Sequence, residues 1–156
     1  MAIEIMAVRE KGGPRVPCLK CTQCCRYATI QVDEPGSASA ASHLLWMSFH
    51  GILLEAAGDG TDWWALVPTR CSELQDDGRC RSYHYRPDIC RKYDAKTCEV
   101  NDTGANVDTV LLTDPERLVG FLFKTRPKVV WQMIRKGYLD RELAGKATGG
   151  KVGASG

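Results

Sequence analysis

Three segments in the first half of the chain have the spacing of apolar side chains expected of strands. Residues 27–32 (Tyr-Ala-Thr-Ile-Gln-Val) alternate in polarity and contain β-branched residues, which is typical of a strand. Residues 52–57 and 63–67 flank the turn sequence Gly58-Asp59-Gly60, and together they predict a β-hairpin. We therefore expect a short antiparallel β portion.

The segment between the first strand and the hairpin predicts one helix. Residues 37–42 are small and are expected to form a loop whose last residue, Ser42, caps the helix. Residues 43–50 place apolar side chains almost all the way round a helix, which is the pattern of a buried helix. No Lys or Arg occurs between residues 27 and 69.

Two more helices are predicted over about residues 114–137. The sequence Thr113-Asp114-Pro115-Glu116 supplies a capping residue, a proline for the first turn and an early acid. Pro127 opens the second helix and Gly137 ends it. Both helices are rich in Lys and Arg, a composition that is typical of a solvent-exposed face. Residues 145–156 are mostly Gly, Ala, Lys and Ser and predict a disordered tail.

Length and composition fit one globular domain, which we expect over residues 1–144. The chain has 156 residues, of which 44% are apolar and 26% are charged, so a modest core is expected. The predicted fold class is α+β, a small cysteine-rich domain with a short antiparallel β portion, a buried helix and two C-terminal helices. The formal net charge of +2 gives no reason to expect nucleic acid as a partner.

The sequence predicts a cytoplasmic protein with no membrane partner. Residues 1–13 include Arg9, Glu10 and Lys11 where an export signal needs an apolar stretch, and no window has the length and apolarity of a membrane span. Structural disulfides are rare in a reducing compartment. The eight cysteines therefore predict metal binding rather than a disulfide framework.

The predicted metal ligands are these cysteines, which form two blocks along the chain. The ligands are Cys18, Cys21, Cys24 and Cys25 in the first block and Cys71, Cys80, Cys90 and Cys98 in the second. A C-x2-C spacing lets a tight loop aim both sulfurs at one centre, because a metal–sulfur bond is only about 2.3 Å long. The C-x2-C-x2-C register repeats the run that surrounds iron–sulfur clusters in ferredoxins. It favours a 4Fe–4S cluster and leaves zinc as the alternative.

Cys24 and Cys25 need a separate interpretation, because adjacent side chains diverge along an extended chain. Either the two thiols serve two metal sites, or one of them is a buried or redox-active thiol. In the second block, the sequence Asp76-Asp77-Gly78 predicts a turn that folds Cys71 and Cys80 together.

The positions next to the cysteines are unusually basic. Pro87 and Asp88 predict a helix start that places Cys90 near the positive end of the helix dipole. Positive charge next to a thiol lowers its pKa and favours the thiolate that binds metal. The cations closest to cysteines in the sequence are Lys20, Arg26, Arg79, Arg81 and Arg91.

Three histidines are weaker ligand candidates. His43 and His50 are seven residues apart and share a face on the predicted helix, and His84 lies among the cysteines of the second block. Histidine can ligate zinc or replace cysteine at some iron sites. Since eight thiols already suffice, we expect these histidines to have structural roles.

The cysteine pattern resembles the YkgJ-type CxxCxxCC cysteine-cluster family, whose members are bacterial and described as zinc- or iron-chelating. The resemblance covers residues 17–99. Besides the eight cysteines, the matching positions are Leu74, Gly78, Tyr83, Arg86, Pro87, Arg91 and Tyr93. Ser82 departs from the family pattern, which usually has an apolar residue there. The resemblance implies metal binding by all or most of the eight cysteines.

The resemblance also bears on enzymatic activity. A relative, the flagellin lysine-N-methylase, combines a similar cysteine cluster with methyl transfer from S-adenosylmethionine. That activity is not carried over, because this chain is short and has no recognisable cofactor-binding region outside the cluster.

Three functional hypotheses follow from the sequence. The first is an iron–sulfur (4Fe–4S) or zinc protein with an electron-transfer, redox-sensing or accessory role toward a protein partner. The second is a structural zinc module that mediates protein interaction. The third is an enzyme that modifies protein side chains, for which no catalytic residue can be named.

Overall fold

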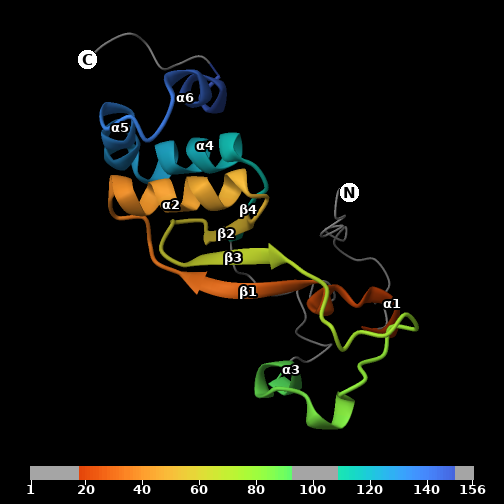
Figure 1. Cartoon of the computed structure of the whole chain (residues 1–156). Helices are drawn as coiled ribbons and strands as arrows, with labels where there is room; N and C mark the ends of the chain where they lie inside the picture. Colours follow the sequence, from red (N-terminus) through yellow and green to blue (C-terminus); the bar gives the residue numbers. More distant parts are fainter. Residues whose placement is uncertain (1–17, 93–108, 150–156) are drawn as a thin grey trace. The chain divides into compact units, whose positions relative to one another are not determined.

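The computed structural model describes residues 18–92 and 109–149, which belong to two compact units (Figure 1). The first, here called the cysteine unit, comprises residues 1–28 and 68–107 and contains every cysteine whose side chain is described. The second, here called the sheet unit, comprises residues 29–67 and 108–156. One domain over residues 1–144 stays a prediction.

A four-stranded sheet in the order β1-β3-β2-β4 forms one layer of the sheet unit. The strands are β1 (Tyr27–Val32), β2 (Leu53–Ala57), β3 (Trp63–Pro68) and β4 (Thr109–Leu112). β2 is antiparallel to both of its neighbours, so Leu54 lies opposite Ala65 on one side and Leu112 on the other. The predicted first strand and hairpin are confirmed, and β4 is a strand that the sequence analysis did not predict.

The turn between β2 and β3 contains the predicted Gly58-Asp59-Gly60 sequence. Gly60 has a φ of 77°, a left-handed conformation that glycine adopts without a steric penalty. The Asp59 carboxylate accepts hydrogen bonds from the hydroxyl and the backbone N–H of Thr61, and these bonds hold its pKa below the ordinary value. The indole N–H of Trp63 donates to the Gly60 carbonyl over 2.9 Å and closes the turn.

Helix α2 (Ala38–Phe49) begins earlier than the sequence analysis predicted. Its cap is Ser37, whose Oγ accepts a hydrogen bond from the Ala40 N–H over 3.1 Å, so the expected loop over residues 37–42 is wrong. The expected burial on all sides is also wrong, because Trp46 is 56% exposed and Phe49 is 61% exposed. Only one face of α2 packs against the sheet unit's core.

The two predicted C-terminal helices are confirmed as α4 (Pro115–Thr125) and α5 (Pro127–Arg135). Asp114 caps α4 by accepting a hydrogen bond from the Arg117 N–H over 2.9 Å. Gly137, with a φ of 71°, follows α5 as the predicted stop.

A further helix, α6 (Arg141–Ala147), was not predicted. It includes residues 145–147, so the expected disordered tail cannot begin at residue 145, and residues 150–156 lie outside the described residues. α6 packs on α4 where α4 has Gly120, since a Cβ at that position would lie 3.1 Å from the carbonyl oxygen of Ala147. The absence of a side chain therefore lets the two helices approach closely.

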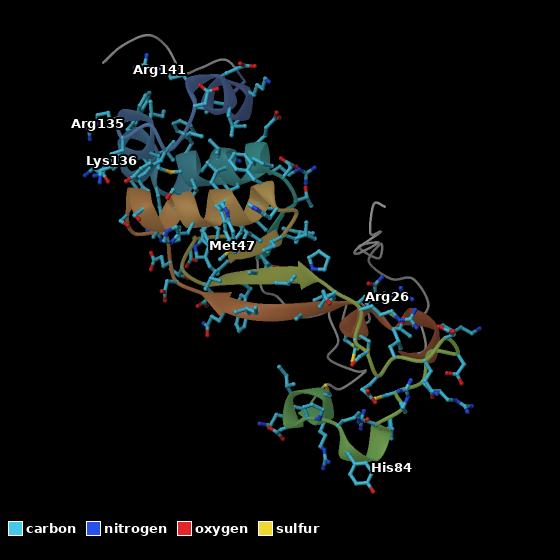
Figure 2. The ribbon with its side chains drawn as sticks, in the orientation of Figure 1. Arg26, Met47, His84, Arg135, Lys136 and Arg141 are labelled. Atoms are coloured by element: carbon cyan, nitrogen blue, oxygen red, sulfur yellow. The ribbon has the colours of Figure 1, made fainter. Side chains whose placement is uncertain are left out.

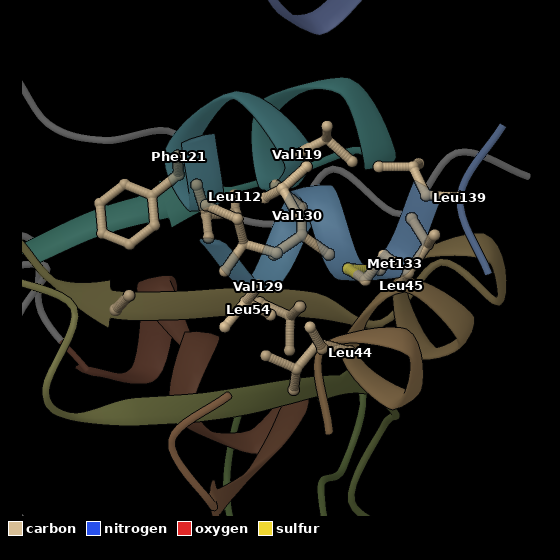
Figure 3. Close-up of a cluster of buried hydrophobic side chains, with 14 of the residues drawn as sticks. Leu44, Leu45, Leu54, Leu112, Val119, Phe121, Val129, Val130, Met133 and Leu139 are labelled. Atoms are coloured by element: carbon tan, nitrogen blue, oxygen red, sulfur yellow. The ribbon is translucent and has the colours of Figure 1, made fainter. Parts of the chain in front are cut away.

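The hydrophobic core of the sheet unit lies between the sheet and its helices (Figure 3). Leu54 and Leu112 face it from the strands, and the rings of Trp63 and Phe121 meet edge to face with their centres 5.6 Å apart. The helices contribute Leu44, Leu45, Leu118, Val119, Leu122, Val129, Val130 and Met133. These contacts confirm the α+β class, with α2 and α4 layered over the sheet in Figure 1.

Arg126, between α4 and α5, binds to the segments that follow β1 and β2. Its guanidinium donates to the Gly60 carbonyl over 2.8 Å and pairs with the Glu34 carboxylate, although the two residues are far apart in sequence. The side chain is only 19% exposed, so solvent screens these interactions weakly. None of the described helices is both long enough and apolar enough to cross a membrane.

Candidate metal centre

The structure describes six of the eight predicted ligand side chains. Cys24, Cys71 and Cys90 are exposed, and Cys21, Cys25 and Cys80 are partly buried. Cys18 begins helix α1, but its side chain is outside the described part, and Cys98 is outside it altogether.

The first cysteine block folds as two short helical turns separated by a reversal. Helix α1 (Cys18–Cys21) is followed by Thr22, whose φ of 50° is left-handed, and then by the 3-10 helix η1 (Gln23–Cys25). The Thr22 carbonyl accepts a hydrogen bond from the Cys25 N–H over 3.0 Å, and its hydroxyl accepts one from Arg26 Nε over 3.1 Å. Sequence reasoning missed this reversal, because threonine gives no signal for a left-handed conformation.

The Cys24–Cys25 pair lies in this 3-10 turn rather than in extended chain. The two side chains are hydrogen-bonded to each other. The argument that adjacent side chains must diverge here is therefore wrong, because it assumed an extended backbone. Consecutive side chains differ in direction by about 120° in a 3-10 turn, compared with about 180° in a strand.

The second block is joined to the first by backbone hydrogen bonds. The Thr69 N–H donates to the Arg26 carbonyl over 3.0 Å, and the Cys71 N–H donates to the Cys25 carbonyl over 2.8 Å. These residues directly precede β1 and directly follow β3, which are neighbours in the sheet. The strand pairing thus continues into the cysteine unit and places Cys71 next to Cys25.

A tight turn connects Cys71 to Cys80, as predicted. Leu74 and Cys80 form an isolated β-bridge, and the Gln75 N–H donates to the Arg79 carbonyl over 2.8 Å. Gly78 has a φ of 83°, and Asp77 accepts a hydrogen bond from the Arg79 N–H. The turn folds the chain back so that Cys80 returns toward the segment that holds Cys71.

Cys90 lies in the short helix α3 (Asp88–Lys92), which directly follows Pro87. The Pro87 carbonyl accepts hydrogen bonds from the N–H groups of Cys90 and Arg91 over 3.0 and 3.2 Å. The helix start predicted from Pro87 and Asp88 is thus within one residue of the observed start.

Burial and the thiols of the second block both affect the pKa of Cys25. Burial is the main cause that raises the pKa of the Cys25 thiol, and the hydrogen bond with Cys24 partly offsets it. Negative charge on Cys71, Cys80 and Cys90 raises the same pKa further. Without a bound cation, this environment favours the protonated thiol.

The cations next to the cysteines mainly order the loops. Arg26 bonds to Thr22, and Arg79 pairs with Asp77 over 3.7 Å. Arg91 Nε donates to the Arg86 carbonyl over 2.8 Å. The prediction that neighbouring cations lower the thiol pKa is wrong at Cys25, because burial dominates there.

The donor chemistry fits a soft metal, since thiolates are the preferred ligands of zinc and of iron–sulfur clusters. Within residues 18–92 and 109–149, no three cysteine, histidine, aspartate or glutamate side chains are close enough together to hold a metal ion. The structure therefore gathers the two blocks in one unit, while a closed set of ligands is not seen among its described side chains.

Comparison with known proteins identifies the family. A family model described as "CxxCxxCC: Putative zinc- or iron-chelating domain" matches residues 17–110, which is more than half of the chain. The chain belongs to the CxxCxxCC family. No curated protein and no solved structure matches it. The resemblance inferred from the cysteine spacing is thereby confirmed, and the family description supports metal binding by zinc or iron.

The CxxCxxCC match includes both cysteine blocks and also the strands β1, β2 and β3. This extent is consistent with the hydrogen bonds described above, because the pairing of β1 with β3 positions Cys25 and Cys71. The matched range therefore contains three of the four described strands as well as the cysteine blocks.

Among the described residues, none of the three histidines belongs to a group of three side chains that could hold a metal ion. His43 and His50 belong to the sheet unit, and His50 Nδ1 lies 2.8 Å from the Trp46 carbonyl oxygen. His84 is exposed in the 3-10 helix η2 (Tyr83–Tyr85), as Figure 2 shows. Its ring centre lies 5.8 Å from that of Tyr83. Neither arrangement favours a histidine ligand over the cysteines.

Proposed function

We propose that the cysteine unit holds a thiolate-ligated 4Fe–4S cluster that serves electron transfer, redox sensing or an accessory role toward a partner enzyme. The observation that carries the proposal is the junction of the two cysteine blocks, where the backbones of Cys25 and Cys71 are hydrogen-bonded. The turn after Cys71 also folds the chain back, with Leu74 and Cys80 in an isolated β-bridge. A run of three thiols completed by a remote thiol is the ligand pattern of such clusters.

The proposed ligands come from the eight cysteines, with Cys25 and Cys71 as the pair at which the blocks meet. A bound cluster would exchange single electrons. The protein's own contribution is to collect the thiols and to order the loops that carry them, which the arginine–carbonyl and arginine–carboxylate contacts do. Exposed thiols at Cys24, Cys71 and Cys90 support a centre near the surface, within reach of an electron partner and also of oxygen.

A structural zinc site is the second candidate, and the small core of the cysteine unit favours it. The described helical turns η1, η2 and α3 contain no buried residue, and Leu74 is the largest buried apolar side chain described there. Units with so little apolar burial commonly depend on metal binding for their folding energy. In that case the metal would hold a surface for protein interaction.

Anaerobic purification followed by iron, zinc and acid-labile sulfide analysis separates the two candidates. We expect a brown protein with near-equal iron and sulfide, and a visible absorption that bleaches on reduction. A colourless protein with stoichiometric zinc would reject the cluster and support the structural site. Folded protein that contains neither metal when prepared without air would reject both.

Cysteine variants test whether the predicted ligands matter. We expect Cys21→Ser and Cys80→Ser each to lose most of the bound metal and to destabilise the cysteine unit, because metal binding supplies folding energy. The matched control is Ser72→Ala, a change at an exposed residue next to Cys71, which should keep its metal. Full metal content in both cysteine variants would show that the ligand set is wrong.

A further inference from the structure

The segment that leads from Cys80 to Cys90 is folded with little help from apolar packing. Neither the 3-10 helix η2 nor helix α3 contains a buried residue. Ile89, the apolar side chain of α3, is 68% exposed. Because no core surrounds this segment, its conformation depends on hydrogen bonds made by its own backbone and side chains.

The Arg91 guanidinium joins α3 to the turn before it. Its Nε donates to the Arg86 carbonyl over 2.8 Å, and its Nη2 donates to the His84 carbonyl over 3.2 Å. Two donors of one rigid, planar group thus bind two carbonyls of the same stretch of backbone. A lysine at this position would keep the charge, but its single nitrogen lies on a flexible stem and has no such fork.

Arg86 extends this arrangement toward Cys80. Its Nε donates to the Tyr83 carbonyl over 3.0 Å, and its guanidinium carbon lies 3.8 Å from the centre of the Tyr83 ring. The Tyr83 N–H in turn donates to the Cys80 carbonyl over 3.3 Å. The side chains of Arg86 and Arg91, together with the carbonyls that they bind, are here called the arginine frame. The frame runs from the backbone of Cys80 to the residue that follows Cys90.

Glu73 connects the arginine frame to the turn that follows Cys71. Its carboxylate accepts a hydrogen bond from the Ser82 hydroxyl over 2.5 Å, and its backbone carbonyl accepts one from the Arg81 N–H over 2.8 Å. The segment that carries Cys90 is thereby joined by hydrogen bonds to the segment that carries Cys71.

We propose that Arg91 is a positioning residue that holds the backbone of α3 so that Cys90 is placed for metal ligation. The proposal rests on the thiolate-ligated centre proposed above. Arg91 acts through the turn before Cys90 and not as a ligand, since the Cys90 N–H donates to the Pro87 carbonyl within that turn. A preformed position reduces the conformational entropy lost when metal binds. Residues that orient ligands commonly change metal affinity by about 10- to 100-fold when they are replaced.

Arg81 provides a matched comparison for Arg91. It follows Cys80 directly, as Arg91 follows Cys90, so each arginine puts a positive charge next to a proposed ligand. Within residues 18–92 and 109–149, the Arg81 side chain has no hydrogen bond or ion pair. An effect of charge alone would therefore act at both positions, whereas an effect of the arginine frame acts only at Arg91.

Alkylation resolved by cysteine tests the proposal on the full chain, isolated without air and with its metal. Initial rates of iodoacetamide labelling are measured for each cysteine by mass spectrometry, and metal release to a chelator is measured separately. Both Arg91→Ala and Arg91→Lys should increase the labelling of Cys90 and the rate of metal release about tenfold. Labelling of Cys71 should stay near its wild-type rate, because the frame acts locally. Arg81→Ala should leave all of these rates near those of the wild type.

The lysine variant separates position from charge. By charge alone, Arg91→Ala would slow the alkylation of Cys90, because the thiolate is the reacting form, and Arg91→Lys would resemble the wild type. Either result overturns the proposal, as does an equal rise in labelling at Cys71 or the same effect in Arg81→Ala. A wild-type chain that holds zinc rejects the iron–sulfur cluster and leaves this comparison intact. A wild-type chain without metal rejects both proposals.

Discussion

Thr22 shows how strongly the first cysteine block depends on one backbone conformation. Its φ of 50° reverses the chain between α1 and η1, so that Cys24 and Cys25 follow Cys21 in a compact segment. A non-glycine residue in this region costs roughly 1–2 kcal/mol. The hydrogen bonds that Thr22 accepts from Cys25 and Arg26 offset part of that cost.

Two substitutions at Thr22 separate these contributions. Both Thr22→Gly and Thr22→Ala remove the hydroxyl, but only glycine relieves the left-handed strain. We expect the glycine variant to be more stable than the alanine variant by about 1 kcal/mol, measured by denaturant unfolding of the metal-loaded protein. Equal stabilities would contradict the left-handed assignment.

Arg126 is the residue on which the link between helices and strands depends. Replacing it with alanine removes its bonds to Gly60 and Glu34, and we expect a loss of about 1–3 kcal/mol in the free energy of unfolding. Lys128→Ala, at an exposed position on α5, should stay within about 0.5 kcal/mol of the wild type. Similar urea midpoints for the two variants would show that the Arg126 contacts add nothing.

At the scale of elements, two serines are candidates for the N-cap of α2. The structure assigns the cap to Ser37, which accepts a hydrogen bond from the Ala40 N–H, while Ser42 lies within the helix and bonds to the Ser39 carbonyl. We expect Ser37→Ala to cost about 1 kcal/mol in unfolding free energy. Ser42→Ala should cost clearly less, and the reverse order in thermal unfolding would place the helix start near residue 43.

The strand pair β1–β3 is the element that joins the fold to the candidate site. Both blocks of cysteines are attached to its end, where Cys25 and Cys71 continue the pairing. Local turns then position the other thiols, as Gly78 does for Cys80. The spacing of cysteines within each block is a local property, whereas the meeting of the blocks depends on the sheet.

At the scale of the whole molecule, the two units should respond differently to metal removal. The sheet unit has its own hydrophobic core, while the cysteine unit buries few apolar side chains. We expect a chelator to increase amide hydrogen exchange across residues 68–92 and to leave α2, α4 and α5 protected. A uniform rise across both units would show that they unfold together.

Local sequence patterns were enough to predict much of the secondary structure of this protein. The alternation in residues 27–32, the glycine turn after β2 and the Asp114-Pro115 cap were correct because strands, turns and caps depend on neighbouring residues. The cysteine spacing also identified the family, because the C-x2-C geometry is a property of one short loop.

Tertiary structure decided the rest. The short strand β4 forms because β2 offers it a free edge, and α6 forms where Gly120 lets it pack on α4. The exposure of Trp46 and the raised pKa of Cys25 depend on which surfaces other segments cover. Burial and long-range pairing are set by residues distant in the chain, and no local pattern of hydrophobic and polar positions contains that information.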